Sequence, residues 1–373
     1  MRDPWAAELL TERLATAAST AARAGIDALL VTPGPDLHHL TGYRALPLER
    51  LTCLVVRSGA DPVLVAPRLE VAAATASPVG ALGIEVVGWD ETDDPYALVA
   101  SLVPGARAVG LDDHMWAEKV LALRVALPDA TQRLAGEVLG ELRMRKAPAE
   151  VDALREAARA IDRVHAQVPG WLRAGRTERE VGADIAAAIT AEGHASVDFV
   201  IVGSGPNGAS PHHELSDRVI EAGDPVVVDI GGTTAAGYCS DSTRTYVVGE
   251  PADDVLASYE VLQRAQARAV EAVRPGVTCA SVDAAAREVI AAAGLGERFI
   301  HRTGHGIGLE THEHPYVVAG NERLLEPGMA FSVEPGIYHP GRHGARIEDI
   351  VVCTQDGVEP LNLTTHELVV VEA

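Results

Sequence analysis

The segments VVVDIGG (226–232) and SDSTRTYVV (240–248) decide the fold of the C-terminal part of this chain. Their β-branched runs predict a strand over 226–230 and its antiparallel partner over 242–248, joined through a glycine-containing turn. Asp229 lies inside the first strand and Asp241 stands at the head of the second. A buried strand carboxylate is costly unless it is compensated, and two neighbouring carboxylates repel each other. A divalent cation is a natural remedy for such a pair.

A second pair of strands further along the chain also carries two carboxylates. Strands are predicted over 329–333 and 347–352, with Glu334 at the end of the first and Glu348 on the second. The two pairs resemble each other as a duplicated unit would. Four carboxylates on two hairpins could bridge two metal ions about 3.5–4 Å apart.

Histidines supply the softer ligands. His305 lies in GHGIG (304–308), where glycines let the backbone pass close to a crowded site. His312 follows seven positions later, and His212 follows Pro211 after a glycine-rich loop. Taken singly, each of these acids and histidines would more often be a structural group with a hydrogen-bond partner. Only a metal site gives all of them one common role.

Outward from these segments, the chain divides into two expected domains. Residues 1–135 alternate strand-like and helix-like segments, which predicts an α/β domain without a chemical constellation of its own. Residues 140–373 carry helices after Pro148, from a Thr177–Glu180 capping box, after Pro251 and up to Gly294. These helices are expected to pack on a largely antiparallel sheet, so the chain is placed in the α+β class.

Composition restricts the kinds of partner. The formal net charge is −22, so the basic surface that nucleic-acid binding requires is absent. None of the four cysteines lies in a CxxC pair, and a chain of 373 residues does not need disulfides to fold. We therefore expect a reduced, cytoplasmic protein. No apolar run is long enough to span a bilayer, so no membrane partner is expected.

Three segments of the chain resemble a known family. The segments DIGG…GYCSDSTRT, HRTGHGIGLETHEHP and EPGMAFSVEPGIY…ARIED are similar to the pita-bread metallopeptidases, which include methionyl aminopeptidase, Xaa-Pro aminopeptidase and prolidase. The likeness covers residues 140–373. Residues 1–135 look like a creatinase-type N-terminal domain through the text HLTGY (39–43). The resemblance implies a pita-bread catalytic domain and these metal ligands: Asp229, Asp241, His305, Glu334 and Glu348.

The resemblance also implies roles around the metal ions. His212, His312 and Glu334 would be catalytic, while His301 and Arg346 would contact substrate. A guanidinium can grip a dipeptide's free carboxylate, but Arg346 could equally pair with Asp349. The chain departs from the family at two points. Asp229 and Asp241 are twelve positions apart where relatives commonly show eleven, and Tyr316 stands where some prolidases have arginine.

The function expected from these features is dinuclear metal-dependent hydrolysis of the Xaa-Pro bond in dipeptides or short peptides. The oxygen-rich ligand set favours Mn²⁺, with Co²⁺, Zn²⁺ or Mg²⁺ as alternatives. Other possibilities are an Xaa-Pro aminopeptidase acting on longer peptides, a related amide hydrolase of the creatinase-like branch, and a binding module of the same fold. Methionyl aminopeptidase is disfavoured because it needs no extra N-terminal domain. The resemblance further implies a homodimer.

Overall fold

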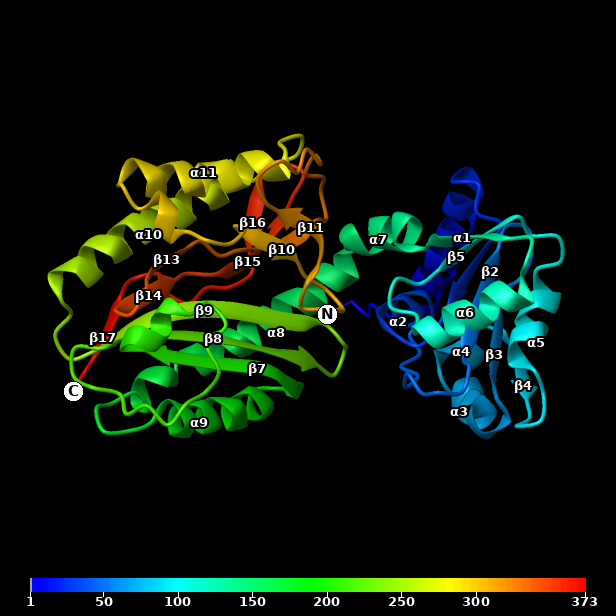
Figure 1. Ribbon diagram of the computed structural model, residues 1–373, viewed down its shortest axis with the longest axis horizontal. Helices are drawn as coiled ribbons and strands as arrows, with labels where there is room; N and C mark the ends of the chain where they lie inside the picture. The colour runs from blue at the N-terminus through cyan, green and yellow to red at the C-terminus, as the bar shows by residue number, and fades with distance from the viewer. Residues whose placement is uncertain (1) are drawn as a thin grey trace. The chain divides into compact units, whose positions relative to one another are not determined.

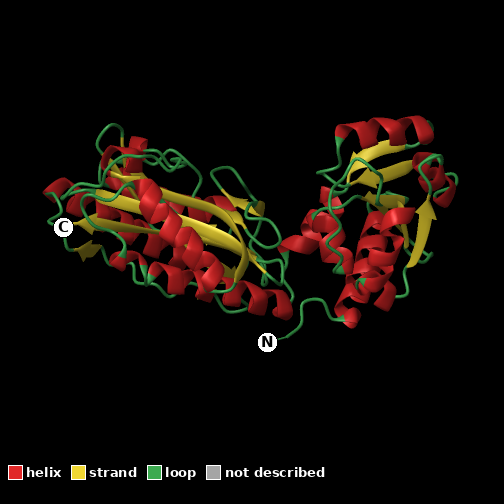
Figure 2. Cartoon of the chain, turned by 90° about the horizontal axis from the view of Figure 1, so that it is seen from below, coloured by secondary structure: helices red, strands yellow, loops and turns green. Residues whose placement is uncertain are grey.

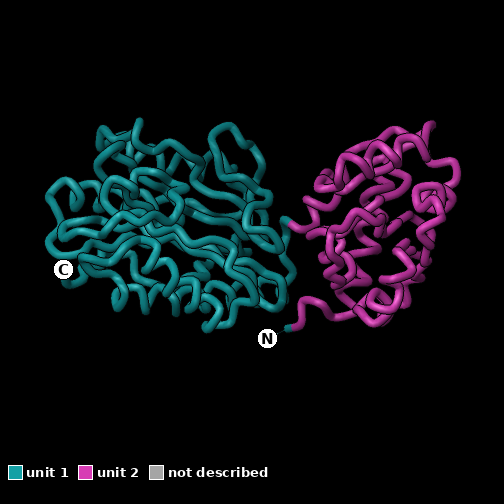
Figure 3. The backbone as a smooth tube through the Cα atoms, turned by 60° about the horizontal axis from the view of Figure 1, so that its bottom comes forward, with its two compact units in different colours: residues 1–2, 144–373 teal, residues 3–143 magenta. Residues whose placement is uncertain are grey.

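The computed structural model describes residues 2–373, which form two compact units (Figure 3). One unit comprises residues 3–143, and the other comprises residues 144–373 with the N-terminal Arg2. The sequence placed the boundary between 135 and 140, whereas the units divide between Arg143 and Met144. Helix α7 (Gly136–Met144) accounts for the offset, because its Val138 and Leu139 pack into the core of the N-terminal unit.

The N-terminal unit is a six-stranded sheet in the order β4-β3-β2-β1-β5-β6, with mixed parallel and antiparallel pairing. Alternate residues of β1 face opposite sides: Leu29 and Val31 join one apolar cluster, while Ala28 and Leu30 join another. Helices therefore cover both faces of the sheet. Its strands are β1 (Ala28–Val31), β2 (Cys53–Arg57), β3 (Val63–Pro67), β4 (Glu85–Trp89), β5 (Ala108–Leu111) and β6 (Thr131–Leu134). Its other helices are α1 (Ala7–Arg23), α2 (Pro35–Thr41), η1 (Arg68–Glu70), α3 (Val71–Ala76), α4 (Pro78–Ala81), α5 (Pro95–Leu102) and α6 (Ala117–Ala126).

The C-terminal unit contains three sheets (Figures 1 and 2). They are a four-stranded sheet ordered β17-β9-β8-β7, a five-stranded sheet ordered β11-β10-β12-β15-β16, and the hairpin β13-β14. The strands are β7 (His194–Ser204), β8 (Pro225–Thr234), β9 (Cys239–Val248), β10 (Gly304–Gly306), β11 (Glu313–Val317), β12 (Ala330–Val333), β13 (Gly336–His339), β14 (His343–Arg346), β15 (Asp349–Cys353), β16 (Val358–Pro360) and β17 (Val369–Val371).

Helices cover the outer sides of these sheets. Figure 1 shows α8 and α9 beside the β7–β9 sheet, and α10 and α11 on the side of β10–β16. The Thr177–Glu180 capping box predicted for α9 is confirmed, since the Thr177 hydroxyl accepts a hydrogen bond from the Glu180 N–H at 3.2 Å. The helices are α8 (Pro148–His165), η2 (Val168–Gly170), α9 (Glu178–Ala191), η3 (Gly205–Ala209), α10 (Asp253–Ala272), α11 (Cys279–Ala292) and η4 (Gly296–Arg298).

Strand alternation places the polar side chains on the inner faces of the sheets. In β8, Val228 and Ile230 pack into the apolar cluster formed with α8 and α9, so Asp229 between them points the other way. In the same manner, Phe331 and Val333 of β12 pack toward α10 and α11, which leaves the following Glu334 on the opposite side. The two sets of acids therefore point into the space between the sheets.

The second pair of strands differs from the sequence-based prediction. β12 and β15 pair antiparallel as expected, with Val333 opposite Asp349. They are not joined by a simple turn, because the hairpin β13–β14 is inserted between them. Glu348 was placed on a strand, but it lies in the short break between β14 and β15. At this break the chain passes from the β13–β14 hairpin to β15 of the five-stranded sheet.

None of the helices within residues 2–373 is both long and apolar enough to cross a membrane.

Candidate metal centre and active site

The five residues named as metal ligands converge in the C-terminal unit. One group brings ligand atoms of Asp229, Asp241 and Glu348 within 4.8 Å of one another, and a second does so for His305, Glu334 and Glu348. Glu348 belongs to both groups, so its carboxylate joins them into one cluster. Residues from β8, β9, β10 and the ends of β12 and β14 thus meet at one place.

The first two acids come from adjacent strands. In the β8–β9 ladder Asp229 lies opposite Thr243, and Asp241 lies opposite Gly231, so the two acids are diagonal neighbours on one face. One oxygen of Asp229 accepts a hydrogen bond from the Arg346 guanidinium at 2.5 Å. Arg346 is the last residue of β14, which belongs to a different sheet from β8. Its hydrogen bond fixes the orientation of the Asp229 carboxylate.

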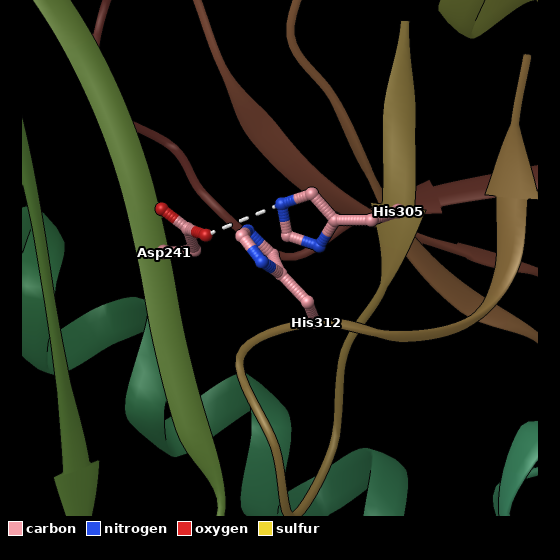
Figure 4. A group of neighbouring side chains, drawn as sticks. All are labelled: Asp241, His305 and His312. Carbon is pink, nitrogen blue, oxygen red and sulfur yellow. Dashed lines mark ion pairs between the residues drawn. The ribbon is translucent and has the colours of Figure 1, made fainter. Parts of the chain in front are cut away.

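His305 is held in a strand that only glycine-flanked sequence can form. A Cβ atom on Gly304 would lie 1.8 Å from the Ser332 carbonyl oxygen, and one on Gly306 would lie 2.1 Å from the His314 carbonyl oxygen. The His305 Nδ1 is 3.1 Å from the Gly306 carbonyl oxygen. Its Nε2 then lies 3.2 Å from Glu334. It also points toward Asp241, 3.5 Å away (Figure 4). A backbone carbonyl on one ring nitrogen is the arrangement that orients a metal-binding imidazole.

The two glutamates are held by hydroxyl groups. The Ser332 hydroxyl donates to Glu334 Oε1 at 2.9 Å, and the same hydroxyl accepts from the His305 N–H at 3.0 Å. The Thr243 hydroxyl donates to Glu348 Oε2 at 2.7 Å. Thr243 belongs to β9, so the first strand pair supports an acid of the second pair.

Burial and mutual repulsion dominate the electrostatics of the cluster. Burial, followed by the charges of Glu348 and Asp229, raises the pKa of Asp241 well above its usual range. Burial and the neighbouring acids raise the pKa of Glu348 in the same way. Burial acts against ionisation of Glu334 as well, but the hydrogen bond and charge of His305 outweigh it and lower its pKa to about 2. Without added positive charge, ionising all four acids at once is therefore unfavourable in free energy.

Two atoms show that a cation fits here. Asp229 Oδ1 and Glu348 Oε1 are buried and have no hydrogen-bond partner among residues 2–373. A buried carboxylate oxygen left without a partner costs free energy that a bound cation would recover. Four carboxylates and one imidazole form an oxygen-rich donor set, which suits divalent ions such as Mn²⁺. The residues present therefore match a metal site.

A cavity of about 910 Å³ opens beside the cluster and lies wholly within the C-terminal unit. All five cluster residues line it, as do His212, His301 and His312, so the structure brings every predicted site residue together. His312 packs edge-on against His305 with ring centroids 4.0 Å apart (Figure 4). Burial, with the nearby His305 and Arg302 charges, lowers the pKa of His312 to about 4, so its imidazole is neutral at pH 7.

Arg346 also lines the cavity, but its guanidinium is already engaged. It is 2 % exposed and donates to Thr243, Tyr338, the Pro211 carbonyl oxygen and Asp229. Asp349, the alternative partner considered from the sequence, pairs instead with Arg244 at 2.7 Å. Tyr338 links Arg346 to His301, whose Nε2 is 2.8 Å from the Tyr338 hydroxyl. Arg346 thus orients Asp229 and closes a polar chain along the cavity wall.

The sequence reasoning missed several residues of this site. Asp198, Phe199 and Ile201 of β7 line the cavity, and so does Arg302. Arg302 lies in the segment HRTGHG (301–306), and a charge between the predicted substrate contact His301 and the candidate ligand His305 was the available signal. Phe199 and Ile201 carried no such signal, because ordinary apolar strand residues do not reveal that they face a cavity.

Glu178, at the start of α9, was also missed as a determinant of the site. Its fully buried carboxylate accepts hydrogen bonds from the Ser204 N–H and hydroxyl, and from Asn207, His213 and Ser216. Burial opposes its ionisation, but these donors outweigh burial and lower the pKa of Glu178. The loop held in this way carries His212 into the cavity.

Comparison with known protein families agrees with this geometry. Residues 152–355 match the model of metallopeptidase family M24, and residues 13–145 match the creatinase/prolidase N-terminal domain. The chain therefore belongs to metallopeptidase family M24, with a creatinase-type N-terminal domain before a pita-bread catalytic domain. The expected fold class and the expected family are confirmed.

The names of individual relatives indicate the type of peptidase more specifically. The chain is 58% identical over 366 residues to a probable dipeptidase PepE of Mycobacterium tuberculosis, covering 98% of this chain and 97% of that one. It is 37% identical to an Xaa-Pro dipeptidase of Lactobacillus delbrueckii subsp. lactis, covering 92% and 95%. The crystal structure of dipeptidase PepE from Mycobacterium ulcerans superposes with a TM-score of 0.95 at 56% identity, covering 99% of both chains. This protein is a metal-dependent peptidase.

Proposed function

We propose that this metallopeptidase hydrolyses the Xaa-Pro bond of dipeptides and uses two divalent metal ions, with Mn²⁺ as the preferred ion. The observation that carries the proposal is the cluster of four carboxylates and His305, with two unpartnered buried oxygens, that lines a cavity of about 910 Å³. The name of the Lactobacillus relative, Xaa-Pro dipeptidase, supports the specificity.

Each ligand has a proposed place. Asp229 would hold one ion, His305 and Glu334 would hold the other, and Asp241 and Glu348 would serve both. Glu348 belongs to both groups of side chains, and Asp241 lies 3.5 Å from His305 as well as beside Asp229. Bound divalent ions would polarise the scissile carbonyl and lower the pKa of the attacking water. The protein's part is to fix the ligands through Arg346, Thr243, Ser332 and the Gly306 carbonyl group.

The protein's own groups would move the proton and stabilise the new charge. Glu334 is ionised at neutral pH, so it can accept a proton from the attacking water. It would pass that proton to the proline nitrogen as the C–N bond breaks, giving a free amino acid and free proline. Neutral His312 and the exposed His212 would donate hydrogen bonds to the carbonyl oxygen as it gains negative charge.

Metal removal tests the metal dependence. Dialysis against a chelator should abolish hydrolysis of Ala-Pro, and added Mn²⁺ should restore it, because the ions supply the activation of water. Titration with Mn²⁺ should give two equivalents per chain at full activity. Full activity in a sample shown to be metal-free by elemental analysis would refute the mechanism.

Three substrates test the specificity. The rates kcat/KM for Ala-Pro, Ala-Pro amide and Ala-Pro-Ala should fall in that order, with Ala-Pro highest. A tripeptide cleaved at least as fast as the dipeptide would identify an Xaa-Pro aminopeptidase. No cleavage of any of the three, together with cleavage of Ala-Leu, would remove the proline specificity while leaving a metal-dependent dipeptidase.

A further inference from the structure

The cavity wall presents two arginines to a substrate, and they differ in what they can offer. Arg346 is buried and gives its N–H groups to protein acceptors, including Asp229 at 2.5 Å and Tyr338 at 2.7 Å. Binding a substrate anion would require it to release a residue of the metal cluster. Arg346 is therefore unavailable to the substrate.

Arg302 is the opposite case. It lines the cavity and is only partly buried. Within residues 2–373, its guanidinium group makes no hydrogen bond and no ion pair, although the ring of carboxylates lies in the same cavity. A cation with unused N–H donors in a binding cavity is positioned to receive an anion from outside the protein.

The position of this guanidinium is nevertheless defined. Its central carbon lies 4.4 Å from the ring centroid of Tyr316, a stacking distance. Tyr316 lies opposite His305 in the β10–β11 ladder, and residues that face each other across a ladder project from the same side. The Arg302 carbonyl group is also fixed, because it accepts a hydrogen bond from His301 Nδ1 at 2.8 Å. Stacking occupies the face of the guanidinium and leaves the N–H groups on its edge available.

We propose that Arg302 binds the free C-terminal carboxylate of a dipeptide substrate in this cavity. The inference rests on the proposed function and makes it more specific. A free carboxylate that leaves water for this cavity needs a positively charged partner, and Arg302 is the cavity arginine whose N–H donors are not used by other residues. A guanidinium can bind a carboxylate through two parallel hydrogen bonds. An amidated or extended peptide carries no charge at that point and gains nothing from Arg302.

The test compares free-acid and amide substrates on the full-length, Mn²⁺-loaded protein. For Arg302→Met, kcat/KM for Ala-Pro should fall by roughly 10–100-fold, mainly through a higher KM, as expected for the loss of a charge-assisted pair. The rate for Ala-Pro amide should stay within about 3-fold, because uncharged peptides make no such pair. Arg302→Lys keeps the charge and should retain part of the preference for the free acid.

Arg298→Met is the matched control, because Arg298 is an exposed arginine four positions away that does not line the cavity. It should leave the acid-to-amide ratio unchanged. Product inhibition gives a second measurement: Arg302→Met should weaken inhibition by proline and leave inhibition by prolinamide unchanged.

The outcomes separate this inference from the proposed function. If wild type cleaves Ala-Pro but Arg302→Met keeps the wild-type acid-to-amide ratio, the role of Arg302 is refuted and Xaa-Pro hydrolysis stands. If wild type cleaves only other dipeptides, the proline specificity fails, and the ratio measured on a cleaved dipeptide decides the role of Arg302. A metal-loaded protein that hydrolyses no dipeptide refutes both.

Discussion

The two acid-bearing strand pairs of the metal cluster achieve the same end by different backbone arrangements. β8 and β9 form a continuous ladder, and both aspartates project directly from it. β12 and β15 form a shorter ladder, and both glutamates lie just beyond its end, beside the inserted β13–β14 hairpin. The shorter side chain is used where the strand itself reaches the site, and the longer one where the backbone has already left the ladder. A similar sequence pattern can thus correspond to two different geometries.

The two pairs also support each other. Arg346, at the end of β14, donates to Asp229 of β8, and Thr243 of β9 donates to Glu348. Asp229 is therefore oriented by the hairpin inserted in the second pair, and Glu348 by the first pair, whereas Glu334 is held by Ser332 of its own strand. Four substitutions test this comparison, in decreasing order of expected effect.

Asp241→Ala should have the largest effect. It removes the aspartate that we propose as a ligand of both ions, so elemental analysis should find loss of metal and activity should fall below detection. Without metal, the variant should unfold at a higher temperature than metal-free wild type, because the substitution relieves the repulsion that raises the pKa of Asp241. Two ions retained in Asp241→Ala would refute the ligand assignment.

His312→Ala changes a residue that belongs to neither strand pair. We expect both ions to remain bound and kcat to fall by roughly 10²–10⁴-fold, the range for a group that assists proton transfer or stabilises charge. His312 also groups with Asp241 and His305 within 4.8 Å. If elemental analysis showed loss of an ion in this variant, His312 would have to be counted as a ligand.

Arg346→Met removes the support that the hairpin inserted in the second pair gives to the first pair. The Asp229 carboxylate would lose its hydrogen bond, and metal affinity should fall by about 10–100-fold, as is usual for groups that orient ligands. Isothermal titration with Mn²⁺ measures this change, and excess Mn²⁺ should restore most of the activity. An unchanged dissociation constant would show that β8 alone orients Asp229.

Thr243→Val removes the reciprocal support, with nearly the same side-chain shape. Only the hydrogen bonds of Thr243 with Glu348 and Arg346 are lost, so metal affinity should fall by no more than about 10-fold. The same titration applies. A larger effect than that of Arg346→Met would mean that the glutamate pair, and not the aspartate pair, depends more on its neighbour.

Much of this site was predictable because local sequence and tertiary structure agree there. The runs around Asp229 and Asp241 are strand-forming by themselves, and the Thr177–Glu180 spacing is sufficient to mark the start of a helix. The acids of these strands could be predicted as metal ligands because a buried charge is unfavourable unless it is compensated.

Other parts could not be read from local sequence. β10 spans only Gly304–Gly306 and contains two glycines, so it has no strand propensity and exists because β11 and β12 pair with it. The β13–β14 insertion lies in a stretch rich in Gly and His, where no alternation of apolar residues marks a strand. Arg346 was expected to face the substrate, but the sequence could not show that Asp229 and Tyr338 would use its donors.

The hydrogen bonds gathered at Glu178 have a consequence for the rate of turnover. Because a single buried carboxylate ties together Ser204, Asn207, His213 and Ser216, the loop carrying His212 cannot swing outward without breaking all of these bonds at once. Such a loop does not behave as a lid that opens and closes in each catalytic cycle. We therefore expect substrate to enter and product to leave without movement of this loop, so solvent viscosity should affect kcat through diffusion of small molecules and not through motion of the loop.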